Sequence, residues 1–476
     1  MLYLILLLPL AMAALSLVKS DRARTVLLTA GQLLLLALLI LACTMGGLSS
    51  PVWHMSRDLT FSLRLDGLGR FFCLLTAFGW LLTIPYSAVY MHHEQRHPRF
   101  YVFLMLTEAM VLGTVLAADL VTLYLFYELT TLLSFPLVLH GQSRQALLGA
   151  GKYLYYSVAG AFLVLFGMVL LHQASPSLAF TPGGSVTVMT PRVLAGVCCI
   201  CLGFGAKAGL YPLHNWLPSA HPVAPAPASA LLSGLITKVG VIGIIRTLYC
   251  LADPAALRGT WVQTVCLILA LLTIVMGSFM GCTENVLKKR LAYSSISQIS
   301  YVLVGVFLLT PAGLLGGLMQ LLFHALAKIG SFQSAGAVIY LTGIETVDGF
   351  PGLARRMPVT VGSFAVMALS LVGIPPFAGF FSKWYLAMGA LDGVSAPMCY
   401  IIPAVLLLSA LLTAAYLFPP LCRSLFPGRD VPVGPRIREP LGLVLPLVIL
   451  AALCLVLGLI PGVTGPIMEM IAGSIL

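Results

Sequence analysis

Apolar stretches long enough to cross a membrane recur from one end of the chain to the other. A membrane-spanning helix needs roughly 20 mainly apolar residues, and helix breakers and charged residues divide this chain into about fourteen such stretches. The pattern predicts an all-α polytopic membrane protein, one continuous array of helices with no separate soluble domain. The approximate cores of the predicted helices begin near Leu2, Val26, Leu68, Tyr101, Leu120, Lys152, Val193, Ala228, Trp261, Ala292, Gly313, Val359, Tyr400 and Leu441. Because no positively charged residue precedes the first stretch, and no small-residue cleavage pattern follows it, we expect a retained helix and not a signal peptide.

The basic residues of the predicted loops are divided unequally between the two sides of the membrane. One set of alternate loops holds Lys19, Arg22, Arg24, Arg96, Arg99, Arg144, Lys288, Lys289, Arg290, Arg355, Arg356, Arg423, Arg429, Arg436 and Arg438, and the other holds Arg57, Arg64, Arg70, Arg192 and Arg258. Cytoplasmic loops carry the excess of lysine and arginine. The first set is therefore predicted to be cytoplasmic, which places both chain termini on the outer side of a bacterial or archaeal cytoplasmic membrane.

Composition agrees with a membrane location and excludes several kinds of function. The 476 residues are 60% hydrophobic and 9% charged, and the formal net charge of +11 is scattered over short loops instead of forming one basic face. This distribution favours contact with anionic lipid headgroups, and we expect no nucleic-acid partner. The 11 cysteines include no CxxC pair, and the tightest cluster, Cys198, Cys199 and Cys201, lies within one helix whose neighbouring side chains point apart. We therefore expect neither a metal site nor a bound cofactor.

One apolar stretch, Leu202–Arg246, combines buried bases with repeated helix breakers. It carries Lys207, His214, His221 and Lys238, and between the two lysines it contains Pro212, Pro218, Pro222, Pro225 and Pro227. Irregular backbone at membrane depth is tolerated only inside a protein or beside a water-filled cavity. Ionisable side chains there are costly and indicate function. We interpret the stretch as part of an ion path, although a position in a cytoplasmic loop is an equally good interpretation for the two histidines.

Two predicted helices before this stretch contain buried acids, Glu108 in the fourth and Glu128 in the fifth. An isolated carboxylate in hydrocarbon is driven to its neutral form, whereas a nearby ammonium group favours ionisation. Lys207 is similarly deep on a nearby helix, so it is the expected partner of Glu128. Such a pair has a closed state with both groups charged and an open state in which the lysine proton is mobile, and the two groups titrate as a unit.

A second group of bases lies in the C-terminal half. His324 and Lys328 are four residues apart and share one face of their helix, and Lys383 follows a proline pair inside another predicted helix. Histidine can pass a proton through its two ring nitrogens, and a buried lysine changes its protonation state where arginine does not. A satisfied core histidine is the alternative interpretation of His324. Hydroxyl groups that can order water between these bases are Tyr124, Tyr127, Thr130, Ser233, Thr237 and Ser382.

The sequence contains a weak internal repeat. The broken segment Gly209–Trp216 has a counterpart in Gly373–Trp384, where proline again interrupts an apolar stretch and a buried base follows. Each segment belongs to a unit of five predicted helices, and an odd number places the two units in opposite orientations, as in many transporters. The predicted organisation is three N-terminal helices in residues 1–99, a first inverted repeat in 100–250, a second in 260–420, and a C-terminal loop and last helix in 421–476.

Several motifs resemble those of one family of membrane proteins. They are F-Y-E-L at Phe126–Leu129, A-K-A-G-L-Y-P-L-H-N-W-L-P-S-A-H at Ala206–His221, A-P-A-P-A-S-A-L-L-S-G at Ala224–Gly234, T-K-V-G at Thr237–Gly240, L-K-K-R-L-A-Y-S-S-I-S-Q at Leu287–Gln298, H-A-L-A-K at His324–Lys328, G-L-A-R-R-M-P at Gly352–Pro358 and G-I-P-P-F-A-G-F-F-S-K-W at Gly373–Trp384. With these motifs the chain resembles the antiporter-like proton-channel subunits shared by respiratory complex I, membrane-bound group 4 nickel–iron hydrogenases and multisubunit sodium/proton antiporters.

The resemblance implies an inverted-repeat fold and translocation of protons or cations. The roles that it implies are Glu128 and Lys207 as a coupled pair, Lys238 and His324 as central carriers with Lys328 beside them, and Lys383 as the terminal base. The chain departs from some family members at four positions. Ser233 stands where they carry histidine, Ser219 where an acid is common and Lys383 where some carry glutamate, and Glu108 is an additional buried acid. The first departure weakens one step of the relay.

Three functions are compatible with these features. The first is a proton-translocating subunit of a redox-driven complex of the hydrogenase or NADH dehydrogenase type, which works with other membrane subunits, including further antiporter-like ones, with lipids, and indirectly with a peripheral redox arm. The second is a sodium/proton antiporter module, in which Glu108, Asp119 and Glu128 contribute to cation binding. The third is a non-conducting scaffold in which the charges only hold helices together.

Overall fold

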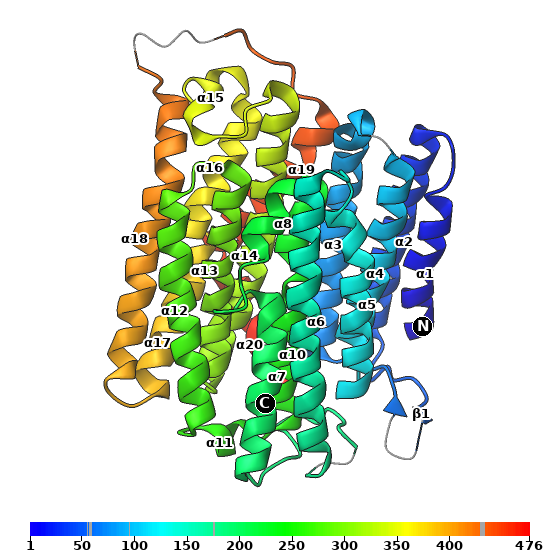
Figure 1. Cartoon of the computed structure of the whole chain (residues 1–476), viewed down its shortest axis with the longest axis vertical. Helices are drawn as coiled ribbons and strands as arrows, with labels where there is room; N and C mark the ends of the chain where they lie inside the picture. Colours follow the sequence, from blue (N-terminus) through cyan, green and yellow to red (C-terminus); the bar gives the residue numbers. More distant parts are fainter. Residues whose placement is uncertain (55, 57–59, 95, 175–176, 429–433) are drawn as a thin grey trace.

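The computed structural model describes residues 1–54, 56, 60–94, 96–174, 177–428 and 434–476. Two of the arginines in the predicted loops, Arg57 and Arg429, lie outside the described residues. Long helices run side by side along the long axis of the molecule (Figure 1). Within the described ranges, eleven helices are long and apolar enough to cross a membrane. The predicted all-α polytopic membrane protein is therefore confirmed.

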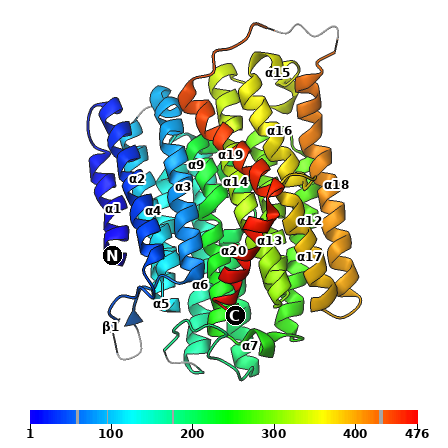
Figure 2. The same ribbon diagram turned by 180° about the vertical axis from the view of Figure 1, so that it is seen from behind.

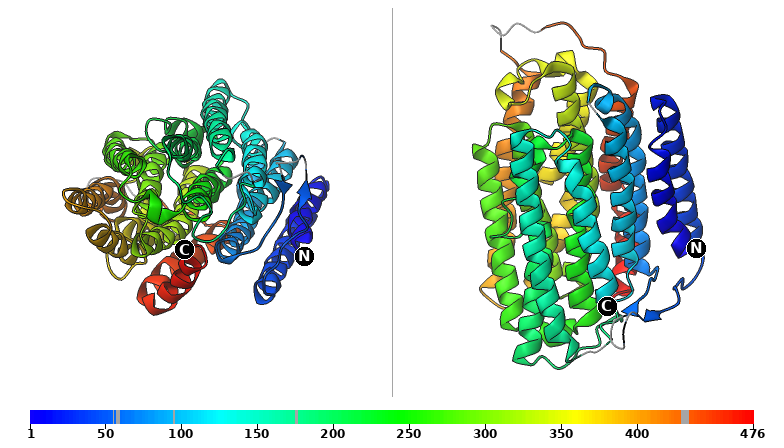
Figure 3. Two further views of the ribbon diagram at one scale, coloured as in Figure 1. Left: turned by 90° about the horizontal axis from the view of Figure 1, so that it is seen from below. Right: turned by 45° about the vertical axis from the view of Figure 1, so that its right-hand side comes forward.

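Most of the elements follow one another along the chain with short connections, and the longer ones are residues 173–190 and 426–440. Their bounds are α1 Leu2–Leu15, α2 Asp21–Thr44, β1 Trp53–His54, β2 Thr60–Phe61, α3 Gly67–Tyr90, α4 His97–Leu116, α5 Leu120–Val138, α6 Arg144–His172, α7 Pro191–Ala208, α8 Leu217–Val223, α9 Ala226–Leu231, α10 Lys238–Arg246, α11 Pro254–Leu257, α12 Trp261–Thr283, α13 Leu287–Phe307, α14 Pro311–Thr342, α15 Leu353–Arg356, α16 Pro358–Val372, α17 Gly379–Gly393, α18 Met398–Leu425, α19 Leu441–Leu459 and α20 Pro461–Gly473. Helices α1 and α2 stand at one edge of the bundle and α18 at the opposite edge (Figure 3). The two short strands pair antiparallel.

Capping side chains mark the starts of several helices. Each accepts a hydrogen bond from the backbone N–H three residues further on, which satisfies a donor that the first helical turn leaves unpaired. These caps are Ser20, Asp66, Asp119, Ser143, Thr190 and Thr310. Polar residues that interrupt the apolar pattern thus define where the long helices begin.

The helix interruptions that the prolines predict are present at two places. Helix α7 ends at Gly209, whose φ of 84° lies in the left-handed region that glycine adopts without strain, and an irregular segment follows before α8. Helix α16 ends in the same way at Gly373, with φ 87°, before α17. A third irregularity is the π-helical turn Leu232–Ile236, which joins α9 to α10. Figure 2 shows α9 and α14 inside the bundle, behind α19 and α20.

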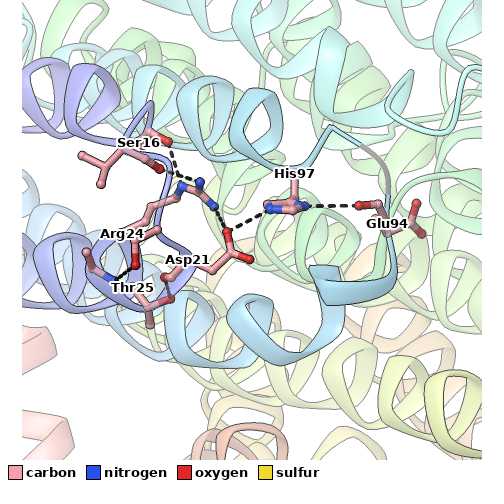
Figure 4. Close-up of polar contacts among 9 residues, drawn as sticks. Ser16, Asp21, Arg24, Thr25, Glu94 and His97 are labelled. Carbon is pink, nitrogen blue, oxygen red and sulfur yellow. Dashed lines mark hydrogen bonds and ion pairs between the residues drawn. The ribbon is translucent and has the colours of Figure 1, made fainter.

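Some basic residues predicted in cytoplasmic loops are instead buried in helices, where they donate hydrogen bonds to backbone carbonyl groups. Arg24, in the first turn of α2, donates from Nε to the carbonyl of Ser16 at 2.8 Å and forms an ion pair with Asp21 (Figure 4). His97, at the start of α4, lies 3.0 Å from the same aspartate. Lys288, in α13, is 6% exposed. Helix starts at this end of the bundle are thus fastened by arginine, lysine and histidine.

A buried ion pair fastens the opposite end. Arg246, at the end of α10, is 1% exposed, and both of its terminal nitrogens donate to Asp66, with Nη2 at 2.9 Å from Oδ1. Asp66 also caps α3 by accepting from Gly69 N–H at 2.9 Å. The pair therefore ties α3 to α10. Bidentate geometry of this kind gives strong, directional hydrogen bonds.

Asp66→Asn is expected to destabilise the protein by about 3 kcal/mol, because Arg246 loses its counter-charge while it stays buried. Asparagine still caps α3. Thermal unfolding of the purified protein in detergent measures the loss. The double variant Asp66→Asn/Arg246→Met should recover most of it; equal melting of the wild type and Asp66→Asn would contradict this account of the pair.

The ion pair between Asp66 and Arg246 also makes the free energy of unfolding depend on pH, with a loss of stability in acid. Burial by itself raises the pKa of Asp66, but the charge and hydrogen bonds of Arg246 outweigh burial and hold that pKa below its usual range. The stabilisation is therefore complete above pH of about 4, near the pKa of an unfolded aspartate, and is lost as pH falls through the lower pKa of the folded state. Asp66→Asn should lack this acid-dependent component in melting curves recorded between pH 7 and pH 3.

Candidate functional site

Lysine side chains from four helices line up across the interior of the bundle. Lys207, Lys238 and Lys328 are completely buried, and Lys383 is partly buried. They belong to α7, α10, α14 and α17, respectively. Helix α10 contacts α7, α13 lies against both α10 and α14, and α14 contacts α17. These contacts arrange the lysines as a row, which we call the polar row together with the side chains that link them.

The first lysine of the polar row lies in an aromatic and hydroxyl environment. Lys207, in the last turn of α7, donates from Nζ to Thr131 Oγ1 at 2.5 Å. The same ammonium lies 4.7 Å from the centre of the Tyr127 ring and 5.8 Å from that of Tyr153, within the range of cation–π attraction. Thr131 and Tyr127 both come from α5, so this helix supplies most of the polar contacts.

The predicted contact between Glu128 and Lys207 is not formed in this structure. Both residues are described, and no salt bridge within 4.0 Å joins them; Thr131, one turn beyond Glu128 on α5, takes the hydrogen bond instead. Glu128 is half-buried on α5. The structure therefore shows Lys207 bonded to Thr131 and not in direct contact with Glu128.

Lys238 is held by the π-helical turn Leu232–Ile236 immediately before it. Its Nζ donates to the carbonyl oxygen of Ser233, which also accepts from Thr237 Oγ1 at 3.0 Å. In a π-helical turn the backbone bonds reach five residues back, as Thr237 N–H does here to Leu232. The displaced backbone brings the Ser233 carbonyl within reach of the two side chains. Such turns are frequent at functional sites.

Ser233 and Ser295 lie between Lys238 and Lys328. The backbone carbonyl of Ser233 accepts from Lys238, and its side-chain hydroxyl makes the next contact. Ser233 Oγ and Ser295 Oγ are 2.7 Å apart, which joins the π-helical turn to α13. Ser295 Oγ donates at 2.9 Å to the carbonyl of Leu291, and Lys328 Nζ donates to the same oxygen at 3.1 Å. The serine at position 233, expected to weaken the relay, therefore makes a direct polar link to the next helix.

The connection towards α17 passes through two glutamines. Gln320 Nε2 donates to Gln298 Oε1 at 2.8 Å, and Ser382 Oγ donates to Gln320 Oε1 at 2.6 Å. His324 lies one turn beyond Gln320 on α14 and is 1% exposed. Neither of its ring nitrogens has a hydrogen-bond partner among the described residues.

The last lysine of the row binds the end of the interrupted helix. Lys383 Nζ donates to the carbonyls of Leu371 and Val372 at 2.7 Å and 2.5 Å, which are among the last carbonyls of α16 and lack partners within the helix. The ammonium also lies 5.3 Å from the centre of the Tyr301 ring. A Cβ atom placed on Gly373 would lie 3.0 Å from the ammonium nitrogen and 2.8 Å from Cδ of the same lysine. The glycine thus provides the space that Lys383 occupies.

In the described part of the chain, the side chains of the three secondary candidates form no hydrogen bond with the residues of the polar row. Glu108 is completely buried on α4 and accepts a hydrogen bond from Gln32 of α2, on the side of the N-terminal hairpin. His214 stacks on Tyr211 within the break after α7. His221, in α8, is completely buried and stacks on Phe332 with ring centres 4.7 Å apart, so it is not a loop residue.

Sequence reasoning missed the side chains that connect the bases. Tyr127, Ser233 and Ser382, expected as water-ordering groups, do line the polar row. Thr131, Ser295, Gln298 and Gln320 were not expected there. The available signal was helical spacing, since Ser295 and Gln298 lie four and seven residues beyond Leu291 and so share its face of α13.

Comparison with known proteins identifies the class of protein to which this fold and this row of bases belong. The family model described as "NADH:quinone oxidoreductase/Mrp antiporter, TM" matches residues 117–411, a range that includes every member of the polar row. The chain belongs to this family of antiporter-like membrane subunits, and the resemblance seen in its motifs is confirmed.

Individual relatives come from several kinds of complex. The chain is 34% identical over 416 residues to NADH-quinone oxidoreductase subunit N of Desulforudis audaxviator, covering 83% of this chain and 81% of that protein. It is 31% identical over 342 residues to Hydrogenase-4 component B of Escherichia coli, covering 69% of this chain and 50% of that protein. Its fold is similar to that of a chain in the Mrp complex from Dietzia sp. DQ12-45-1b, with a TM-score of 0.88, 22% identity, and coverage of 100% of this chain and 97% of that chain.

Gly373→Ala is expected to destabilise the protein more than Gly343→Ala. Both glycines end a helix with positive φ, so alanine adds strain of about 1 kcal/mol at either position. Only at Gly373 does the new methyl group meet Lys383; at Gly343 nothing lies within 4 Å. Thermal unfolding of both variants should show the larger loss for Gly373→Ala, and equal losses would mean that Gly373 does not determine the position of Lys383.

Proposed function

We propose that this chain translocates protons along the polar row as an antiporter-like subunit of a redox-driven membrane complex. The observation that carries the proposal is the set of hydrogen bonds between Lys238 and Lys328. Lys238 donates to the Ser233 carbonyl, the Ser233 hydroxyl bonds to that of Ser295, and the Leu291 carbonyl accepts from both Ser295 and Lys328. Burying two ammonium groups completely costs free energy that packing does not require, so their presence indicates a functional role. Hydroxyl groups can accept and donate a proton at once, so they can serve between titrating bases.

Each base has a role that its position supports. Lys207 switches between two partners. It is held by Thr131, as in this structure, or it pairs with Glu128, and its proton becomes mobile when that pair opens. Lys238 and Lys328 are the central carriers. His324, whose two nitrogens are unpartnered among the described residues, relays a proton between Lys328 and the glutamines that lead to Lys383. Lys383 is the terminal base.

The energy for translocation comes from neighbouring subunits in this proposal. Moving one charge across about 100 mV takes about 2.3 kcal/mol, and the sequence carries no cofactor motif that can gather redox energy. Relatives named NADH-quinone oxidoreductase subunit N and Hydrogenase-4 component B support a redox-driven partner. The chain then works beside other membrane subunits, including further antiporter-like ones, with lipids, and with a peripheral redox arm that it does not touch.

The finer architecture of the proposal is fourteen spans with two inverted five-helix repeats, in residues 100–250 and 260–420, between the segments 1–99 and 421–476. The matching helix ends at Gly209 and Gly373 support the repeat, since both have positive φ and both precede an irregular segment. The α1–α2 junction and α15 lie at the upper end of the molecule in Figure 1, and the marked termini lie lower. With the basic end in the cytoplasm of a bacterium or archaeon, both termini face outward.

A sodium/proton antiporter module is the second candidate, favoured by the similarity to a chain of the Mrp complex. Its predicted cation ligands are less suited to that role. Asp119 accepts hydrogen bonds from Ser62 Oγ and from both the N–H and the hydroxyl of Thr122, and Glu108 is bound to Gln32. Ion movement into inverted vesicles that stops when sodium is removed would favour the antiporter module over the proton path.

Lys328→Ala and Lys207→Ala are expected to reduce proton pumping by the reconstituted whole complex at least about a hundredfold, because a positioned acid–base group contributes that much to proton transfer. Glu128→Gln should have a similar effect. Lys152→Ala is the matched control: this lysine is exposed on α6, and its ammonium group bonds only to Ser219 Oγ, at 3.4 Å. Wild-type pumping in the variants of the polar row would end the proposal and leave the scaffold interpretation.

Ser295→Ala is expected to slow pumping about tenfold, because it removes the hydroxyl between Ser233 and the Leu291 carbonyl and leaves a buried group without its partner, a cost of about 1–3 kcal/mol. Ser300→Ala is the control on the same helix, since that buried hydroxyl donates only to Ile296 of its own helix, at 3.0 Å. Proton pumping and thermal unfolding are measured on both. Equal pumping in the two variants would show that the serine link is not used.

A further inference from the structure

A large apolar groove, separate from the polar row, opens on the face formed by α3 and α20. Its volume is about 920 Å³. Helices α14 and α19 contribute to its walls, and its apolar lining includes Leu74, Phe78, Leu322, Leu457 and Ile467. Figure 2 shows α20 running along this face towards the end of the bundle that carries β1. An apolar groove of this size on a membrane protein lies within reach of lipid acyl chains.

The mouth of the groove is positively charged. Arg64 and Arg70 line it at the start of α3, beside Asp66. The carboxylate of Asp66 is already engaged by both terminal nitrogens of Arg246. The four side chains together, three arginines and one aspartate, therefore leave two positive charges at the mouth.

The two lining arginines have unused hydrogen-bonding capacity. Arg70 donates weakly, from Nη2 to the Met45 carbonyl at 3.3 Å, and its buried Nε has no partner among the residues described. Arg64 donates from Nη2 to the Phe180 carbonyl at 2.8 Å and lies 3.8 Å from Asp66. Guanidinium groups bind phosphate oxygens with two parallel hydrogen bonds. An anion with several oxygens at the mouth would satisfy the donors that the protein leaves open.

We propose that this groove binds an anionic phospholipid. Its phosphate lies between Arg64 and Arg70, and an acyl chain lies along the groove between α3 and α20. The apolar lining of the groove accommodates a hydrocarbon chain. The two uncompensated positive charges at its mouth attract an anionic headgroup at the membrane surface. A neutral quinone or an apolar helix of a neighbouring subunit would fill the lining but would leave both arginines without an anion.

The proposed lipid site lies where α3, α14 and α20 meet. Asp66 at the mouth is the residue that fixes α3 to Arg246 of α10, and α20 contacts both α3 and α14, the helix of His324 and Lys328. Binding in the groove therefore holds α20 against α3 and α14. The site is independent of the proposed proton path, so either can fail without the other.

The test is native mass spectrometry of the full chain, purified in detergent and equilibrated with phosphatidylglycerol or with phosphatidylcholine. The wild type should retain phosphatidylglycerol preferentially. Each arginine near a lipid headgroup contributes about fivefold to binding of an anionic lipid, so Arg70→Gln should lower the preference about fivefold and Arg64→Gln/Arg70→Gln roughly 25-fold. Arg192→Gln, an exposed arginine outside the groove that is bonded to Gln173, is the matched control and should leave the preference unchanged.

Blocking the groove separates lipid binding from general surface charge. Ile467, which lines the groove and is 45% exposed, tolerates a larger side chain without disturbing the core. Ile467→Trp should release both lipids while both arginines remain. Retention of phosphatidylglycerol in both the double arginine variant and Ile467→Trp would overturn the proposal. So would co-purification of a quinone in place of the lipid, or equal retention of the two lipids by the wild type.

Discussion

Three ammonium groups of the polar row are held by backbone carbonyl oxygens, which offset part of the cost of removing a charge from bulk water. Lys238 donates to the carbonyl of Ser233, Lys328 to that of Leu291, and Lys383 to those of Leu371 and Val372. Within the described part of the chain, no carboxylate forms a salt bridge with any of the three. A carbonyl dipole holds a cation less firmly than a carboxylate does, so these lysines are solvated without being locked in the charged form.

Departures from regular helix supply most of those carbonyls. The Ser233 carbonyl belongs to a π-helical turn, and Leu371 and Val372 are the last residues of α16. Lys288 uses the same device, donating to Pro222 and Ala224 where α8 ends. Glycine and proline therefore do more than interrupt helices here. They position carbonyl groups that a continuous α-helix would use for its own hydrogen bonds, and buried cations take them.

The sequence was sufficient to predict the helical membrane fold, the two interruptions and the four lysines, because composition and helix breakers act locally. It was not sufficient for their partners. Lys207 bonds to Thr131 instead of Glu128, since the reach of the two side chains depends on how α5 and α7 are rotated against each other. Ser295 and Gln320 went unnoticed because polar residues on a buried helix become meaningful only once the facing helix is known. The burial of Lys288, expected in a loop, follows from the fold of α8 over it.

The π-helical turn Leu232–Ile236 contains one residue more than a regular α-helical turn, since its hydrogen bonds reach five residues back instead of four. An α-helix has 3.6 residues per turn, so each residue adds about 100° of rotation. Converting the turn to regular α-helix would therefore rotate α10, which follows it, by about 100° about the helix axis. That rotation would swing Lys238, the first residue of α10, away from the Ser233 carbonyl, which belongs to the turn itself. The contact between Lys238 and Ser233 therefore depends on the π-helical form of this turn, and a rotation of α10 about its own axis would break it without shifting α10 along its length.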